Sequence, residues 1–150
     1  MRPNLRPFDL LDTSVFVHLS RGSATGLRIE AEFHLTKRAE RPMFSTYTEG
    51  EILGFARFKG WNEEKLKRLN DLFESFVRVE SGRPEVVDAY ADLYSINRRL
   101  GLNLGMNDLW IAATARATKS RLLTCDRDFE RIPDNWIDCL WIDPITGRTP

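Results

Sequence analysis

Two kinds of hydrophobic pattern alternate along the chain. Short apolar runs bounded by polar residues are typical of buried strands, whereas apolar residues that recur every three or four positions are typical of helices. The first pattern predicts strands over residues 8–12, 42–45, 77–80, 121–124 and 136–142. The second predicts a helix that begins at Thr13 and further helices over residues 27–40, 46–58, 62–76, 84–101 and 107–119.

Residues at the helix boundaries support several of these limits. Pro84 stands where a helix can begin and Gly101 where it can end, because proline suits the first helical position and glycine the left-handed closing position. Asn107 is expected to cap the next helix, and residues 21–26 are expected to form a loop. Strands that alternate with helices predict an α/β domain with a mostly parallel central sheet. Ligand sites in such sheets lie at the carboxyl ends of the strands.

Length and composition indicate one globular domain. The 150 residues favour a single domain over 1–150, and 22 basic residues balance 22 acidic ones, so no net charge attracts nucleic acid. The chain lacks an apolar run of about 18 residues, and no membrane span is expected. Residues 1–7 are expected to form a short, flexible basic tail rather than a signal peptide, which makes the cytoplasm the default compartment.

Acidic residues follow two of the predicted strands. Asp12 comes directly after the first strand, and Asp126 and Asp128 follow the strand over 121–124. Because the carboxyl ends of parallel strands meet at one edge of the sheet, these side chains are expected to gather there. A structural alternative stays open for each of them, since aspartate commonly caps a helix after a strand.

Asp108 stands at the start of the Ala-rich helix over 107–119. Its own helical face carries Ile111, Ala112 and Ala115, which form a small-residue stripe suited to close packing. The carboxylate is therefore expected to point towards the packed interior or a cleft beside it. The alternative is that Asp108 only interacts favourably with the helix dipole.

Two glutamates, Glu49 and Glu51, lie two positions apart at the head of one predicted helix and must point in different directions. At about 100° per residue, Glu51 is centred on a face that also carries Tyr47, Phe55 and Phe58. Glu49 lies on the far side, where the helix dipole favours it. Burying an unpaired carboxylate is costly, so Glu51 either reaches solvent or is compensated by another group.

A divalent cation would compensate such a group of acids. Carboxylates gathered at one end of a sheet repel one another, and Mg²⁺ or Mn²⁺ relieves the repulsion by taking oxygen ligands. Such a site can activate water and neutralise charge on a phosphodiester. Other kinds of site lack support, because glycine-rich phosphate loops, the paired-histidine zinc motif and the Gly-x-Ser-x-Gly elbow are absent from the sequence.

Four segments, in order, resemble motifs of the PIN-domain ribonucleases, and in particular of the VapC-type toxins of toxin–antitoxin pairs. They are LLDTSVFV at 10–17, STYTEGEILGFA at 45–56, NDLWIAATA at 107–115 and LLTCDRDFERI at 122–132. The second segment carries Ser45, Thr48 and Glu51 in the family's Ser-x-x-Thr-x-x-Glu pattern. The resemblance covers nearly the whole chain and implies one three-layer α/β/α domain.

The resemblance also implies the chemistry of the site. The acidic quartet would consist of Asp12, Glu51, Asp108 and Asp126. Asp12 and Asp108 would be the firmest ligands of Mg²⁺ or Mn²⁺. Glu51 and Asp126 would complete the site, directly or through water, with Asp128 as an alternative to Asp126. Ser14 and Thr124 match positions that supply hydroxyls near the metal. The implied reaction is hydrolysis of RNA phosphodiesters by a metal-activated water, and the implied partners are a small antitoxin and a second copy of the chain.

Two features depart from the family pattern. Trp110 stands where many relatives carry a small or aliphatic residue, and the chain is neutral rather than basic. Affinity for RNA would then rest on local basic residues, namely Arg21, Arg116, Lys119, Arg121 and Arg127. Two other functions stay open: a PIN-like module that binds RNA or protein without cleaving, and a metal-dependent phosphatase or DNA nuclease. A measurement of metal binding distinguishes the first of these from a nuclease, and cleavage of a panel of substrates distinguishes the second.

Overall fold

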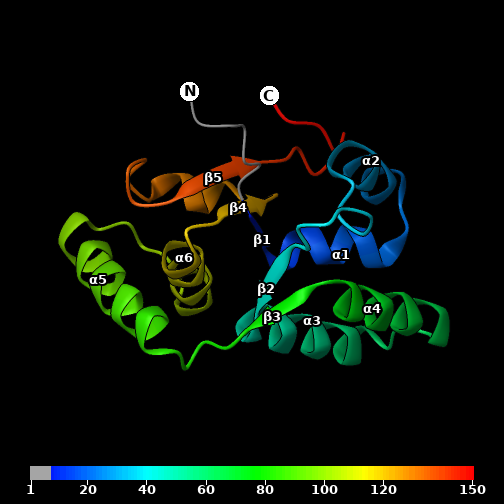
Figure 1. Ribbon diagram of the computed structural model, residues 1–150, viewed down its shortest axis with the longest axis horizontal. Coiled ribbons are helices and arrows are strands. Elements are labelled where there is room, and N and C mark those ends of the chain that lie inside the picture. The colour runs from blue at the N-terminus through cyan, green and yellow to red at the C-terminus, as the bar shows by residue number, and fades with distance from the viewer. Residues whose placement is uncertain (1–7) are drawn as a thin grey trace.

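The computed structural model describes residues 8–150, and its centre is a five-stranded parallel sheet (Figure 1). The strands are β1 (Asp9–Leu11), β2 (Met43–Ser45), β3 (Val77–Val79), β4 (Arg121–Thr124) and β5 (Asp138–Trp141). Their order across the sheet is β3-β2-β1-β4-β5, and every neighbouring pair is parallel. The prediction of an α/β domain with a mostly parallel sheet is confirmed. The tail expected over 1–7 lies outside the described residues.

The path of the chain across the sheet reverses at β1. The chain builds outward from β1 through β2 to β3, and then returns to add β4 on the other side of β1, followed by β5. Leu10 and Leu11 of β1 lie opposite Leu122 and Leu123 of β4. In open α/β sheets, ligands bind outside the carboxyl ends of the strands at such a switch point. The loops that leave β1 and β4 therefore flank the favoured place for a site.

Helices cover both faces of the sheet (Figure 1). They are α1 (Thr13–Arg21), α2 (Ala24–Phe33), α3 (Thr46–Lys59), α4 (Glu63–Ser75), α5 (Pro84–Leu100), α6 (Met106–Thr118) and the short 3-10 helix η1 (Arg127–Arg131). Successive strand residues point to opposite faces. Leu11 and Leu123 accordingly join a core with α1 to α4, whereas Leu10 and Leu122 join a second core with α5, α6 and η1. The predicted three-layer arrangement is confirmed.

The segment after α1 differs most from its prediction. The loop expected over 21–26 and the helix expected over 27–40 are both wrong in their limits, because α2 starts inside that loop and ends well before residue 40. The side chain of Ser23 accepts a hydrogen bond from the Gly26 N–H (3.2 Å) and caps the helix. A Cβ on Gly26 would lie 2.2 Å from the carbonyl oxygen of His18. This glycine therefore permits close approach of α1 and α2 and does not mark a turn.

Smaller differences lie around the last helix and strand. Gly105, and not Asn107, caps α6, and Asn107 is an exposed residue of the first helical turn. The strand expected over 136–142 is shorter at both ends. Sequence patterning missed η1, which begins where the Asp126 side chain accepts a hydrogen bond from the Asp128 N–H (2.9 Å). Among the described residues, no helix combines the length and the apolar character that a membrane span needs.

Candidate metal centre

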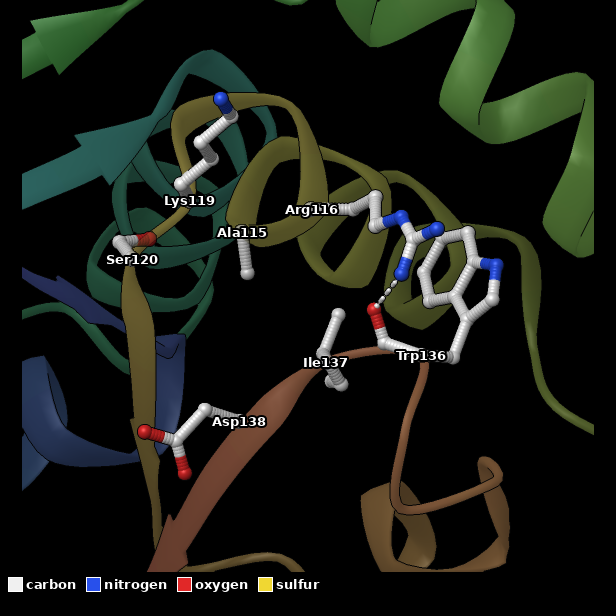
Figure 2. A pocket seen from close by; sticks show the side chains of 7 residues that line it. All are labelled: Ala115, Arg116, Lys119, Ser120, Trp136, Ile137 and Asp138. Atoms are coloured by element: carbon white, nitrogen blue, oxygen red, sulfur yellow. Dashed lines mark hydrogen bonds between the residues drawn. The ribbon is translucent and has the colours of Figure 1, made fainter.

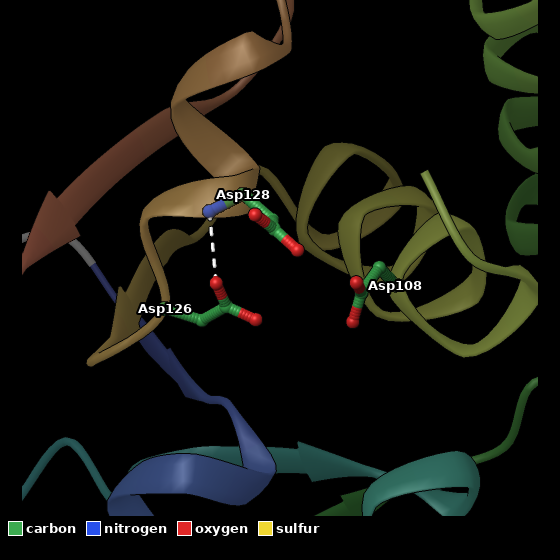
Figure 3. A group of neighbouring side chains, drawn as sticks. All are labelled: Asp108, Asp126 and Asp128. Atoms are coloured by element: carbon green, nitrogen blue, oxygen red, sulfur yellow. Dashed lines mark hydrogen bonds between the residues drawn. The ribbon is translucent and has the colours of Figure 1, made fainter. Parts of the chain in front are cut away.

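Three carboxylates meet at the carboxyl edge of the sheet, beside the switch point. Asp108, in the first turn of α6, faces Asp126 and Asp128, which follow β4 (Figure 3). Each residue offers one carboxylate oxygen that lies within 4.8 Å of those offered by the other two. All three residues are half-buried. The structure thus brings together acids that lie far apart in the sequence.

Asp12 lies deeper, directly after β1, and is buried. Its carboxylate Oδ2 accepts hydrogen bonds from the hydroxyls of Ser14 (2.8 Å) and Thr124 (2.7 Å). Burial raises the pKa of Asp12, and the hydrogen bonds from Thr124 and Ser14 oppose that rise because they favour the charged form. Asp12 occupies the N-cap position of α1, as the structural alternative expected, but its side chain makes no capping hydrogen bond there and is bound to Ser14 and Thr124 instead.

The two hydroxyls that hold Asp12 also bind the backbone of the β4 loop. The Ser14 hydroxyl accepts a hydrogen bond from the Cys125 N–H (3.0 Å), and the Thr124 hydroxyl accepts one from the Asp126 N–H (2.9 Å). Asp12 is therefore linked through these hydroxyls to the loop that carries Asp126. This network fixes the relative positions of two acids from neighbouring strands.

Hydroxyl groups of the Ser-x-x-Thr-x-x-Glu segment and of Thr13 form the surroundings of Glu51. Ser45 caps α3, because its hydroxyl accepts a hydrogen bond from the Thr48 N–H (3.1 Å). The Thr13 hydroxyl lies 3.4 Å from that of Thr48 and donates a shorter hydrogen bond to Glu51 Oε1 (2.9 Å). Since Thr13 follows Asp12 directly, this bond joins Glu51 to the loop after β1. Sequence reasoning missed Thr13, whose only signal is its place behind the aspartate that ends the strand.

The face of α3 that packs inward is not the aromatic one. The buried residues of α3 are Thr48, Ile52 and Ala56. Phe58 is 84% exposed whereas Tyr47 and Phe55 are half-buried, so the aromatic face that carries Glu51 packs only partly against the protein. Glu51 is half-buried on one flank of the buried stripe, where Thr13 reaches it. Glu49 lies on the other flank and forms a salt bridge with Arg78 of β3 (3.2 Å).

The pKa of Asp108, like that of Asp12, is raised above its usual value. Its pKa is raised from 3.8 to about 7, first by burial and then by the negative charges of Asp12, Asp126, Glu51 and Asp128. Within the described residues, no lysine or arginine forms a salt bridge with Asp12, Glu51, Asp108 or Asp126. Such a cluster of carboxylate oxygens without a basic partner fits a hard divalent cation such as Mg²⁺ or Mn²⁺.

Hydrogen bonds distinguish Asp126 from Asp128. The carboxylate of Asp128 forms a salt bridge with Arg131 (2.8 Å). Asp126 uses Oδ1 to accept the Asp128 N–H, and its second oxygen points towards Asp108 (Figure 3). A cation would have to compete with Arg131 for Asp128, whereas it meets no such competitor at Asp126. The geometry therefore favours Asp126 as a ligand and Asp128 as an outer residue.

Arg127 is the one basic residue among the five singled out in the sequence that lies beside the acids. It follows Asp126 directly, and its guanidinium lies 3.6 Å from the centre of the Trp141 ring. The other four lie away from the acids: Arg21 at the end of α1, Arg116 and Lys119 at the end of α6, and Arg121 at the start of β4. Arg127 is also paired with Glu130, and the nearby Arg131 with Asp128, so the site has little unpaired positive charge with which to attract phosphate.

A separate pocket lies at the opposite, amino edge of the sheet, between the end of α6 and the start of β5 (Figure 2). Its volume is about 400 Å³. Arg116 donates a hydrogen bond to the Trp136 carbonyl oxygen (2.6 Å), and its guanidinium lies over the Trp136 ring. Asp138 is the only carboxylate that lines this pocket. The pocket therefore lacks the group of acids that marks the carboxyl edge.

Comparison with family models decides the relationship that the sequence motifs suggested. The model described as "PIN domain" matches residues 10–135. The chain belongs to the PIN-domain family. The match includes the acids at the carboxyl edge of the sheet, which are Asp12, Glu51, Asp108, Asp126 and Asp128. The comparison with curated proteins finds no match.

Solved structures of VapBC complexes share the fold of this PIN domain. VapBC2 from Rickettsia felis, bound to promoter DNA, is 20% identical with a TM-score of 0.74, over 88% of this chain and 96% of that chain. DNA-bound VapBC from Salmonella typhimurium is 21% identical with a TM-score of 0.75, over 89% and 96%. VapBC-1 from nontypeable Haemophilus influenzae is 23% identical with a TM-score of 0.73, over 89% and 97%. At these identities the likeness establishes the fold alone.

The raised pKa of Asp108 predicts a pH-dependent stability for the metal-free PIN domain. Because the folded pKa of about 7 exceeds the usual 3.8, folding takes up a proton between these values, and stability falls as the pH rises through that window. Melting temperatures measured in EDTA at several pH values should decline towards neutral pH. Asp108→Asn should flatten this decline. An equally steep decline in the variant would contradict the assignment to Asp108.

Proposed function

We propose that this chain is a metal-dependent endoribonuclease that acts as the toxin of a type II toxin–antitoxin pair. The observation that carries the proposal is the convergence of acids at the switch point of a PIN-domain sheet, with no basic residue paired to four of them within the described chain. Those four are Asp12, Glu51, Asp108 and Asp126. A module that only binds RNA or protein gains nothing from placing mutually repelling carboxylates together. A metal-dependent nuclease requires such a group of carboxylates to hold its cation.

Three acids are suited to hold the cation: Asp12, Asp108 and Asp126. When bound, Mg²⁺ or Mn²⁺ would polarise the phosphodiester, neutralise its developing charge and lower the pKa of a water molecule. The Asp12 carboxyl group accepts hydrogen bonds from two hydroxyls, which pre-orient it. Asp108 faces Asp126 across the site, and its raised pKa means that cation binding near neutral pH should release a proton.

Glu51 is suited to handle a proton rather than to hold the cation alone. Thr13 fixes Oε1, while Oε2 accepts no hydrogen bond from the described residues. A carboxylate held in this way can accept the proton of the attacking water as the water oxygen bonds to phosphorus. The phosphorus–oxygen bond to the leaving ribose oxygen then breaks, and that oxygen takes up a proton from solvent.

The toxin role brings two protein partners into the proposal. The VapBC structures that share this fold are toxin–antitoxin complexes, one of them described as a member of the VapBC family of toxin–antitoxin systems. We infer that the chain pairs with a small antitoxin, forms a homodimer and acts in the cytoplasm. Analytical ultracentrifugation of the isolated chain should give twice the monomer mass. A monomer at micromolar concentration would contradict the dimer.

Cleavage of RNA with and without metal tests the proposed activity. The purified chain should cleave single-stranded RNA in Mg²⁺, lose that activity in EDTA and recover it when excess Mg²⁺ is added. DNA of the same sequence serves as the substrate control. Cleavage that survives EDTA would contradict the mechanism, and absence of both cleavage and Mn²⁺ binding would favour the catalytically silent PIN-like module. Preferential cleavage of DNA would favour a DNA nuclease.

The two glutamates of α3 provide a matched pair of variants. Glu51→Gln is expected to lower RNA cleavage roughly 100- to 10,000-fold, the usual contribution of a group that accepts a proton in the transition state. Glu49→Gln should leave the rate within about twofold, because Glu49 pairs with Arg78 on the protein surface and exposed pairs contribute little. Single-turnover rates at saturating Mg²⁺ measure both. A larger loss in Glu49→Gln than in Glu51→Gln would contradict the assignment.

A further inference from the structure

A second pocket adjoins the candidate metal centre between α3 and α6. Its volume is about 450 Å³, and the residues that line it are Thr46, Tyr47, Gly50, Glu51 and Asn107. Glu51 belongs both to this pocket and to the group of acids, since its charge helps to raise the pKa of Asp108. A molecule in the pocket would therefore lie directly beside the acids. We call this space the α3–α6 pocket.

One wall of the α3–α6 pocket ends a stack of three aromatic rings. Tyr47 of α3 stacks on Trp110 of α6 with ring centres 5.2 Å apart and ring planes 11° apart. Trp110 stacks in turn on Tyr90 of α5, at 3.9 Å and 14°. Because three helices contribute to the stack, the Tyr47 ring is held rigidly. Tyr47 is half-buried and lines the α3–α6 pocket, so the part of its ring that Trp110 does not cover borders that space.

The remaining lining suits a flat, polar-edged molecule. Gly50 leaves open space, because a Cβ built there would meet nothing within 4 Å. Asn107 is exposed on the first turn of α6, and its amide can both donate and accept hydrogen bonds. Within the described residues, its side chain makes no hydrogen bond. A flat ring face, an open floor and an uncommitted amide together match the face and the edge of a nucleobase.

Charge makes such a contact useful for an RNA substrate. The chain has no net charge, and the acids at the site repel phosphate groups. Arg127 and Arg131, which lie beside the site, pair with Glu130 and Asp128, so attraction of the RNA backbone is weak there. Stacking of bases on aromatic side chains does not depend on charge and contributes substantially to binding of single strands.

We infer that the α3–α6 pocket receives one nucleobase of a single-stranded RNA substrate, stacked on Tyr47, next to the phosphodiester that lies at the acids. The inference rests on the proposed nuclease function, and it gives Trp110 a role as the residue that positions Tyr47. It also explains how a neutral chain can retain an RNA strand at an acidic site.

Two glycines on α3 allow a matched test. Gly50→Leu should fill the α3–α6 pocket, whereas Gly54→Leu places the same side chain one turn further on, where it also meets nothing within 4 Å and lines no part of this pocket. Both variants should melt at a higher temperature than the wild type, because glycine is unfavourable inside a helix. Only Gly50→Leu should weaken RNA binding. Weaker binding in a more stable protein cannot arise from misfolding.

The probe is a fluorescein-labelled oligoribonucleotide of eight adenosines, compared with an eight-residue ribose phosphate strand that carries no bases. Binding is followed by fluorescence anisotropy with Ca²⁺ in place of Mg²⁺, which supplies a hard cation for the acids. Gly50→Leu and Tyr47→Leu should each raise the Kd for the adenosine strand roughly tenfold, the size expected for one base–aromatic contact. Tyr47→Phe, which keeps the ring, should bind like the wild type. The base-free strand should respond to none of these variants.

The outcomes separate this inference from the proposed function. Equal responses of the two strands, or no response of the adenosine strand to Gly50→Leu and Tyr47→Leu, would overturn the base pocket and leave the space to another occupant such as a partner's side chain. RNA cleavage in Mg²⁺ is measured independently on the same proteins. Base-dependent binding without any cleavage would support the pocket while contradicting the nuclease. Cleavage without base-dependent binding would support the nuclease while overturning the base pocket.

Discussion

Replacing Asp108 with asparagine is expected to reduce RNA cleavage at least about 1,000-fold, since loss of a metal ligand removes several kcal/mol of transition-state stabilisation. Asp108 faces Asp126 and Asp128, and its charge interacts with those of Asp12 and Glu51 as well. Asparagine keeps the shape of the side chain but supplies only a neutral ligand. Initial rates at several Mg²⁺ concentrations would show both the loss and any weaker metal affinity.

Asp138→Asn is the control for this prediction. Asp138 is an exposed aspartate at the start of β5, at the opposite edge of the sheet from the acids. The same chemical change there should leave the rate within about twofold, as surface substitutions usually do. Similar losses in the two variants would contradict a special role for Asp108, because they would point to a general effect of lost negative charge.

Replacing Phe16 with alanine is expected to cause a large loss of stability. Phe16 is fully buried on α1, and its ring lies 5.3 to 5.6 Å from the rings of Phe44, Phe73 and Phe76. These contacts join α1 to β2 and α4. Phe16→Ala should lower the free energy of unfolding by about 3–5 kcal/mol, from lost burial and from the cavity that remains.

Phe58→Ala is the matched substitution on the surface. Its side chain is 84% exposed, so removing it should change the free energy of unfolding by no more than about 0.5 kcal/mol. Urea denaturation followed by far-ultraviolet circular dichroism measures both variants. Equal effects of the two substitutions would show that the aromatic cluster around Phe16 is not the centre of this core.

The sequence predicted the central strands β1 and β4 well because they are buried on both faces. A run such as Arg121–Thr124 is short, apolar and bounded by polar residues, and its limits agree with the structure. At Gly26 the same approach wrongly predicted a loop, because a glycine that allows two helices to touch cannot be distinguished in sequence from one that makes a turn. Packing between helices, which hydrophobic periodicity does not report, decided that segment.

In the candidate site, too, the sequence predicted residues placed by general rules of sheet geometry and missed a specific contact between distant residues. Asp12 and Asp126 were placed by the rule that strand ends meet at one edge, which the parallel pairing of β1 with β4 satisfies. The helical-wheel argument for Glu51 rested on an aromatic face that proved to be half-buried at Tyr47 and Phe55 and exposed at Phe58. Hydrogen bonding by Thr13 places Glu51 instead, and that contact joins residues 38 positions apart. Only the folded chain reveals such a partner.

Anomalous diffraction from crystals grown with Mn²⁺ would test the central claim most directly. The account predicts an anomalous peak in contact with carboxylate oxygens of Asp108 and Asp126 and within ligand or water-bridged reach of Asp12, with Asp128 still bound to Arg131. The peak should vanish in Asp108→Asn crystals grown in the same way. A crystal that shows Mn²⁺ elsewhere on the chain, with none among these acids, would contradict the proposed metal centre.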